Sequence, residues 1–283
     1  MSAERQGASA DSGREPEGSL VAHPFEDVTY TETDHVGVLT INRPEKHNAL
    51  RFETYDEIDL VVRTTRARAL VITGAGRSFC SGDDLQEVMT AKPVDADGNP
   101  RRTSFGGLTP LARTLLETDV PTIAAVNGAA VGWGMELAVL CDVRIASVKA
   151  RFGEIFVKRG LVPDVGGSAR LARIIGHQNA MRLLLTGDIV DAAVAWKLGL
   201  VLEVVEPEAL MDTALGFAGS IAANPPLAVR RTKEGLRKVA TGASEEEFGT
   251  WFAAAIRDLK ETRDHRESVA AFLEKREPRY TGE

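Results

Sequence analysis

Cysteine is scarce in this chain, because only Cys80 and Cys141 occur among its 283 residues. Two cysteines cannot build a disulfide framework, so the composition excludes a small disulfide-stapled domain and fits a reducing compartment. We expect both thiols to fill space in the interior and the protein to be cytoplasmic. Basic residues are also in deficit, since 34 lysines and arginines stand against 41 acidic residues, a net charge of −7. This balance gives no electrostatic reason to expect nucleic acid or an acidic membrane as a partner.

Long hydrophobic runs are missing as well. Residues 1–24 are mostly small, polar or charged and lack the apolar core of a signal peptide, so we expect a disordered tail. Residues 120–135 carry no charge, but the run contains Pro121 and four other turn-forming residues and is too short to span a bilayer. A buried strand and turn are expected there, and no membrane partner.

Apolar segments with strand and helix patterns alternate along the first two thirds of the chain. This alternation predicts an α/β fold with largely parallel strands, and 43% hydrophobic residues suffice for a real core. The expected strands are 28–43, turning at Thr33-Asp34-His35, and 69–73, 122–126 and 143–147. The expected helices are 108–117 and a segment capped by Asn48 that runs through Val61.

Strand character fades after Glu208, and helical patterns follow at 214–223, 227–238, 245–259 and 265–275. The chain therefore divides into the tail 1–24, a core at 25–206 and a helical region at 207–283. Residues 90–107 are rich in glycine, proline and charge and predict a mobile surface loop.

The stretch VNGAAVGWGMELAVLCD at 126–142 is the most informative segment. An apolar run meets glycines around Trp133, and helix-forming residues follow at once, which predicts a strand, a tight turn and a helix with Glu136 on its first turn. Free N–H groups at a helix start can stabilise developing negative charge, and a nearby carboxylate can move a proton. Such an anion cradle beside a base suits chemistry at a carbon next to a carbonyl.

Further motifs occupy the rest of the chain over roughly residues 27–278. They read INRPEKHNAL at 41–50, VITGAG at 71–76, SFCSGDDL at 78–85, RFG at 151–153, GLVP at 160–163 with GG at 166–167, LLTG at 184–187, KLGLV at 197–201, PPLAV at 225–229 and AAFLEKR at 270–276. In this order they resemble the enoyl-CoA hydratase/isomerase, or crotonase, superfamily. The resemblance implies a spiral of ββα units with a helical C-terminal oligomerisation region, a homotrimer or hexamer, and an acyl-CoA substrate with no permanently bound cofactor. Residues 90–107 would then border the acyl pocket as a lid, or form a plain disordered loop.

The resemblance also implies site residues. The backbone N–H groups of Asp83 and Trp133 would form the oxyanion hole, so their side chains are free to vary. Glu136 matches the first of two glutamates used by hydratases of this family, although a first-turn glutamate can also simply complement the helix dipole. The implied CoA-binding positions are Lys46, Asn48, Ala49, Leu50, Asp84 and Leu85. The histidines at 47, 177 and 265 lack metal-ligand spacing, so no metal site is predicted.

The second hydratase glutamate is absent, because Phe156 occupies its position and would line the acyl pocket instead. Asp164 offers a replacement carboxylate, or is a turn residue after Pro163. Glu154 is expected on a solvated face or in an ion pair with Lys158 or Arg159.

A double-bond isomerase needs less than a hydratase. One carboxylate can take a proton from C2 of a 3-enoyl thioester and return it at C4 while the oxyanion hole holds the dienolate. Glu136, alone or with Asp164, could do this, so the leading prediction is an enoyl-CoA isomerase. An enoyl-CoA hydratase and an acyl-CoA-binding homologue without hydratase activity are the alternatives.

Overall fold

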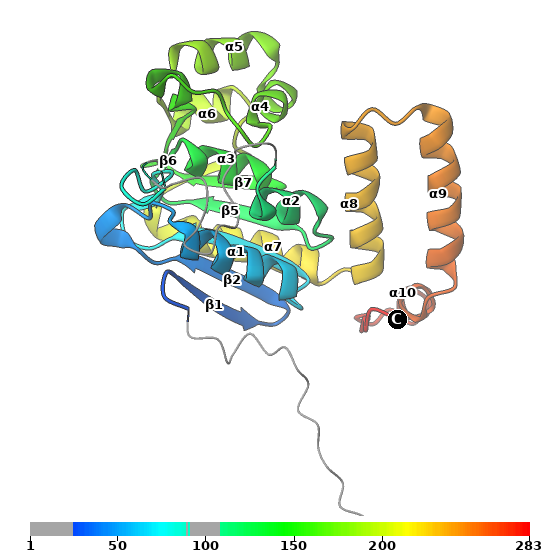
Figure 1. Cartoon of the computed structure of the whole chain (residues 1–283). Helices are drawn as coiled ribbons and strands as arrows, with labels where there is room; N and C mark the ends of the chain where they lie inside the picture. Colours follow the sequence, from blue (N-terminus) through cyan, green and yellow to red (C-terminus); the bar gives the residue numbers. More distant parts are fainter. Residues whose placement is uncertain (1–24, 89, 91–107) are drawn as a thin grey trace, which may run out of the picture.

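The computed structural model describes residues 25–88, 90 and 108–283, so the predicted tail and nearly all of the predicted loop at 90–107 lie outside the described residues. Six strands form the main sheet, in the order β1-β2-β3-β5-β7-β10 (Figure 1). Every neighbouring pair is parallel except β1 and β2, which confirms the predicted α/β class. The strands are β1 (Val28–Thr33), β2 (Val36–Ile41), β3 (Ala69–Gly74), β5 (Thr122–Val126), β7 (Val143–Ser147) and β10 (Glu203–Val205).

Local backbone geometry explains how the first two strands pair. Asp34 and His35 both have positive φ angles, 50° and 65°. Two successive residues of this kind give a tight hairpin turn whose twist matches the strands. The hairpin therefore turns at the predicted place.

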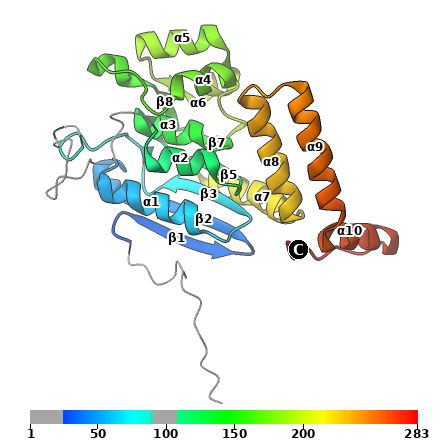
Figure 2. The ribbon, with the colours of Figure 1, turned by 45° about the vertical axis from the view of Figure 1, so that its right-hand side comes forward.

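The two faces of the main sheet are covered by different helices (Figures 1 and 2). Along β3, Ala69 and Val71 pack towards α7 (Leu210–Ala222), whereas Leu70 and Ile72 pack towards the opposite layer. That layer contains α1 (Phe52–Thr64), α2 (Pro110–Glu117) and α3 (Trp133–Leu140). Both faces of β3 are thus buried, as its uninterrupted apolar sequence requires.

A second, four-stranded sheet lies next to α3 and carries the site. It runs in the order β4-β6-β8-β9, with β4 (Ser78–Cys80), β6 (Ala129–Val131), β8 (Arg151–Gly153) and β9 (Val190–Asp191). Helices α4 (Gly167–Ile175) and α5 (His177–Thr186) lie between β8 and β9 in the chain, and the short helix α6 (Ala192–Lys197) follows β9. Cys80, at the end of β4, and Cys141, directly after α3, are both buried and form no disulfide, as expected.

The helical C-terminal region begins at α7 and continues as α8 (Pro226–Ala240), α9 (Glu245–Lys260) and α10 (Arg263–Glu274), which confirms the four predicted helices. Figures 1 and 2 show α8 and α9 as a hairpin beside the core. The Lys233 ammonium joins α8 to the core by donating to the Val120 carbonyl (2.7 Å) and the Asp142 carboxylate (2.6 Å). No helix in the described residues is long and apolar enough to cross a membrane.

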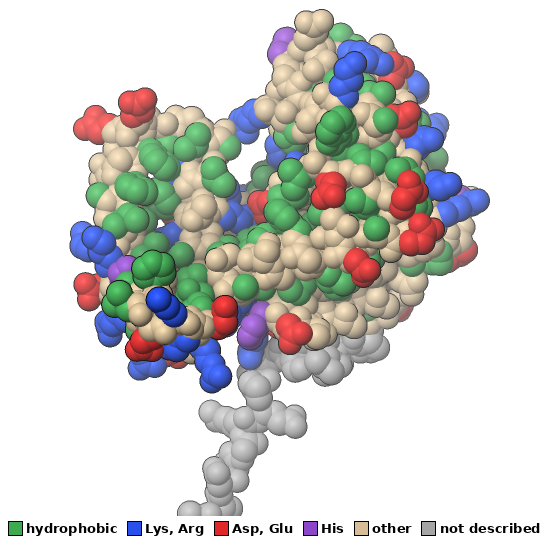
Figure 3. Space-filling view, turned by 180° about the vertical axis from the view of Figure 1, so that it is seen from behind, with side chains coloured by type: hydrophobic (Ala, Val, Ile, Leu, Met, Phe, Trp, Pro, Cys, Tyr) green, Lys and Arg blue, Asp and Glu red, His purple; other side chains and the backbone are tan. Residues whose placement is uncertain are grey.

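Apolar side chains gather on helices α8, α9 and α10, which Figure 3 shows from behind. The exposed ones are Leu236, Val239, Phe252, Ile256, Val269, Phe272 and Leu273. A role of this region in oligomerisation stays a prediction.

The prediction that Asn48 caps α1 is wrong. The helix starts at Phe52 with Arg51 as its N-cap, and Asn48 lies at a positive φ of 57°. Its side-chain carbonyl accepts from the Arg43 N–H (3.0 Å), and its amide donates to the carbonyls of Ala75 (2.9 Å) and Ser78 (2.6 Å). Tertiary hydrogen bonds therefore occupy the side chain and hold the 43–48 turn against the β3–β4 connection.

Candidate active site

The segment at 126–142 folds as predicted, into a strand, a glycine turn and a helix. Strand β6 ends at Val131, and the next residue, Gly132, has φ 57° and ψ −127° and precedes the first residue of α3. A side chain at Gly134 would lie 2.0 Å from the Cys80 carbonyl oxygen, so glycine is needed for α3 to approach β4. Glu136 lies in the first turn, and its N–H donates to the Gly132 carbonyl (3.1 Å).

The two segments predicted to form the oxyanion hole lie side by side. Gly82 has φ 95°, and a Cβ there would lie 2.9 Å from the Val131 carbonyl oxygen and 3.3 Å from the Trp133 nitrogen. Asp83 forms an isolated parallel bridge with Leu50. Within the described residues, the N–H groups of Asp83 and Trp133 have no hydrogen-bond acceptor. Two free backbone donors at one place are what an oxyanion requires.

The side chains of these two residues are less free than predicted, because both contact Tyr55 on α1. The Tyr55 hydroxyl donates to the Asp83 carboxylate (2.5 Å), and the Tyr55 ring meets the Trp133 ring edge-on with centroids 4.8 Å apart. Burial raises the pKa of Asp83 to about 6; the hydrogen bond from Tyr55 opposes this rise and the charge of Asp164 adds to it. Tyr55 thus ties the two turns together through their side chains.

Glu136 is fully buried beside the guanidinium of Arg170. The Arg170 guanidinium on α4 lies 3.6 Å from its Oε2, an ion pair too long to count as a hydrogen bond. A Cβ on Gly167 would lie 1.8 Å from its Oε1, so the start of α4 presses against the carboxyl group. Burial raises the pKa of Glu136 to about 7; Arg170 lowers it and the charge of Asp164 raises it. A carboxyl group with a pKa near neutrality can both take and return a proton.

The expectation for Glu154 is wrong. Its side chain is neither solvated nor paired with Lys158 or Arg159, because the residue is only 1% exposed and both those basic residues are exposed. Within the described residues, neither carboxyl oxygen has a hydrogen-bond partner. Burial raises its pKa well above the usual value, and the charge of Glu136 raises it further. The peptide enters the 3-10 helix η3 (Ile155–Arg159) at this residue, so strand alternation does not fix the direction of its side chain.

Asp164 lies in the loop before α4 and is half-buried. Its Oδ1 is buried without a hydrogen-bond partner among the described residues. Its charge raises the pKa values of Asp83, Glu136 and Glu154. Asp164 therefore belongs to the same electrostatic cluster as the other three carboxyl groups, whereas a plain turn residue would face solvent.

A cavity of about 370 Å³ opens beside the oxyanion segments. Seven of the predicted site residues line it: Lys46, Ala49, Asp83, Asp84, Leu85, Trp133 and Phe156. Asn48 and Leu50 are fully buried behind its wall, and neither Glu136 nor Asp164 lines it. Arg159 also lines the cavity and supplies a second positive charge beside that of Lys46. Arg159 was not among the site residues predicted from the sequence.

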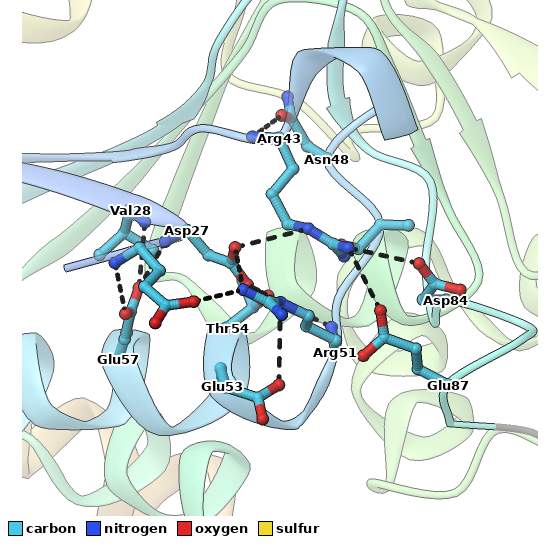
Figure 4. Close-up of polar contacts among 12 residues, drawn as sticks. Asp27, Val28, Arg43, Asn48, Arg51, Glu53, Thr54, Glu57, Asp84 and Glu87 are labelled. Carbon is cyan, nitrogen blue, oxygen red and sulfur yellow. Dashed lines mark hydrogen bonds and ion pairs between the residues drawn. The ribbon is translucent and has the colours of Figure 1, made fainter. Parts of the chain in front are cut away.

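The buried Arg43 side chain contacts two turns that line the cavity, and Figure 4 shows its polar contacts. The Arg43 guanidinium donates to the Ala49 carbonyl (2.5 Å) and lies 3.4 Å from Asp84 and 3.5 Å from Asp27. It thereby joins the 46–50 turn to the 82–85 turn, both of which line the cavity. The only indication of this role in the sequence is the position of Arg43 directly before Pro44 in the motif at 41–50.

The two free backbone N–H groups at these turns, beside a cavity in an α/β fold, have the arrangement of an enzyme that stabilises negative charge on a substrate oxygen. The family model described as enoyl-CoA hydratase/isomerase matches residues 31–283, so the chain belongs to that family, the crotonase superfamily. A short-chain-enoyl-CoA hydratase of Clostridium acetobutylicum is 37% identical, with 85% of this chain and 92% of the relative covered. A 1,2-epoxyphenylacetyl-CoA isomerase of Escherichia coli is 35% identical, with 87% and 95% covered. The crystal structure of an enoyl-CoA hydratase from Bacillus anthracis superposes with a TM-score of 0.83 at 31% identity, covering 91% of this chain and all of that one.

Proposed function

We propose that this family member is an enoyl-CoA hydratase, which adds water across the double bond of a 2-enoyl-CoA thioester. The thioester oxygen is held by the N–H groups of Asp83 and Trp133, where each donor contributes roughly 3 kcal/mol to the stability of the enolate. Glu136 takes the proton of the attacking water as oxygen joins C3, and a proton then passes from Glu136 to C2. Atoms and charge balance, because Glu136 ends the cycle as a carboxylate.

The observation that carries this proposal is the position and acidity of Glu136. It lies in the first turn of the helix that begins with Trp133, and its pKa of about 7 suits a group that must be base and acid in one turnover. The similarity to a short-chain-enoyl-CoA hydratase at 37% identity supports hydration over the leading prediction from sequence, which was isomerisation.

Binding of the CoA moiety is proposed at the outer part of the same cavity. Lys46, Ala49, Asp84 and Leu85 line it, and Lys46 and Arg159 supply positive charge suited to phosphate groups. We also propose that the protein is cytoplasmic and forms a homotrimer or hexamer. A second copy of the chain would cover the apolar side chains exposed on α8–α10.

Double-bond isomerisation is the second candidate, and a specific residue favours it. Phe156 replaces the second glutamate and lines the cavity, where it can neither hold a water molecule nor give a proton. The similarity to a 1,2-epoxyphenylacetyl-CoA isomerase at 35% identity supports this candidate too. In this reaction Glu136, with or without Asp164, moves a proton between C2 and C4 of the acyl chain.

Mass spectrometry in heavy water separates the two reactions. The enzyme is incubated with a panel of 2-enoyl- and 3-enoyl-CoA thioesters, next to the variants Glu136→Gln and Asp164→Asn. Gain of a whole water molecule supports the hydratase, whereas deuterium on carbon with a moved double bond and no added water supports the isomerase. Binding of acyl-CoA without either change would indicate a binding protein and overturn both proposals. Full activity of Glu136→Gln would remove Glu136 from the mechanism.

A further inference from the structure

Glu154 is a buried carboxyl group to which the proposed reaction gives no role. It follows β8 directly, and the Gly153 carbonyl before it accepts from the Gly132 N–H (2.8 Å) at the turn that starts α3. This hydrogen bond brings the end of β8 against the segment that carries Glu136. With 1% exposure and no hydrogen-bond partner among the described residues, an ionised Glu154 would be strongly disfavoured.

Three charged groups from neighbouring elements influence Glu154. They are Glu136 on α3, Arg170 on α4 and Asp164 in the loop before α4. Lys158 and Arg159, on its own segment, are exposed to solvent. One guanidinium therefore faces three carboxyl groups, two of which, Glu136 and Glu154, are buried. Ionisation of both buried carboxyl groups beside a single guanidinium is strongly disfavoured.

The ion pair decides where the proton resides. Arg170 lies 3.6 Å from Glu136 and also donates to the Val165 carbonyl, whereas Glu154 has no cation within ion-pair distance among the described residues. The negative charge is thus better tolerated on Glu136. Burial and the Glu136 charge raise the pKa of Glu154 well above the usual value, which agrees with the geometry.

We propose that Glu154 is a proton-holding positioning residue for Glu136: it retains the proton of this buried pair, so that Glu136 retains the charge and serves as the base. The inference rests on the proposed function and extends it. Phe156 occupies the position of the second glutamate, and Glu154 supplies the second carboxyl group of the site from a different position. Glu154 acts through Glu136 and not on the substrate. When Glu154 loses its proton at alkaline pH, the added charge raises the proton affinity of Glu136, so Glu136 gives its proton to C2 less readily and turnover falls.

Infrared spectroscopy at pH 8 tests where the proton resides, without any need for activity. The protonated-carboxyl C=O band is expected in the full-length wild type and in the control Glu203→Gln, which alters an exposed glutamate on β10. The band is expected to vanish in Glu154→Gln, a neutral side chain of nearly the same shape. Absence of the band in the wild type, or its persistence in Glu154→Gln, would overturn the proposal.

The pH profile of kcat/KM between pH 6 and 10 tests the consequence for turnover. Glu154→Gln imitates the protonated form, so we expect activity within about threefold of wild type near pH 8 and an unchanged rise near pH 7. The alkaline decline of the wild type should be missing in this variant. If Glu154→Gln leaves the shape of the pH profile unchanged, Glu154 is merely structural and the proposal is refuted. A fall in kcat/KM of more than 100-fold at every pH would mean that Glu154 acts on the substrate, which refutes the proposal as well. Inactivity of the wild type would refute the proposed function alone, since the infrared result would still stand.

Discussion

Replacing Glu136 with glutamine is expected to stabilise the fold at neutral pH while it abolishes turnover. In the folded protein the pKa of Glu136 is raised from 4.5 to about 7, mainly by burial. The folded state therefore binds this proton more tightly than the unfolded state does. Its contribution to the free energy of unfolding is fully present below about pH 4.5 and is lost as the pH rises through 7.

The magnitude follows from the two pKa values. At about 1.4 kcal/mol for each pKa unit, the rise from 4.5 to about 7 corresponds to roughly 3 kcal/mol of lost stability at pH 8. The ion pair with Arg170 is already included in this value, because it lowers the pKa. The glutamine variant never carries the charge and does not suffer this loss.

Thermal unfolding at fixed protein concentration measures the difference. Wild type and Glu136→Gln are expected to have similar melting temperatures near pH 5, and the variant to melt roughly 5–10 °C higher at pH 8. The control Glu117→Gln alters a carboxylate that is 69% exposed, in a 3.8 Å pair with Arg113, and should track the wild type at every pH. Parallel curves for wild type and Glu136→Gln between pH 5 and 8 would refute the reasoning. The rate of the variant is expected to fall by about 10²–10⁴.

Three further substitutions test the supports of the site. Gly167→Ala places a Cβ 1.8 Å from the Glu136 carboxyl group, so we expect the free energy of unfolding, measured by chemical denaturation, to fall by ~1–3 kcal/mol and most activity to be lost. The control Gly219→Ala, in open space on α7, should change neither the stability nor the activity. Tyr55→Phe removes the hydrogen bond to Asp83 and should raise the pKa of that carboxyl group further above 6, as measured by carbon NMR of labelled aspartate; an unchanged pKa would contradict the contact. Arg43→Lys cannot replace all the contacts in Figure 4 and should cost ~2–4 kcal/mol and raise KM for the acyl-CoA, whereas Arg63→Lys, 60% exposed, should leave both unchanged. Equal KM values for the two arginine variants would argue against a role of Arg43 at the cavity wall.

Features that depend on local backbone conformation could be predicted from the sequence. The strands at 122–126 and 143–147 were predicted to the residue, because short apolar runs between turn signals leave few alternatives. The turn at Gly132 and the first-turn position of Glu136 follow from glycine, whose positive φ permits the sharp entry into α3. The prediction failed at Asn48, where local capping preference lost to three tertiary hydrogen bonds.

The sequence by itself determined the α/β class, the strands at 122–126 and 143–147 and the glycine turn before Glu136, since each depends on residues adjacent in the chain. Only the tertiary structure decided which side chains meet behind the turns at Asp83 and Trp133. The contact of Tyr55 with both turns joins α1 to segments far along the chain. The burial of Glu154 was equally hidden, because β8 ends there in a 3-10 helix and the direction of the side chain depends on how that helix packs against its neighbours. The proton affinity of Glu136 is set by that packing, through desolvation and through charges that the sequence does not place near one another.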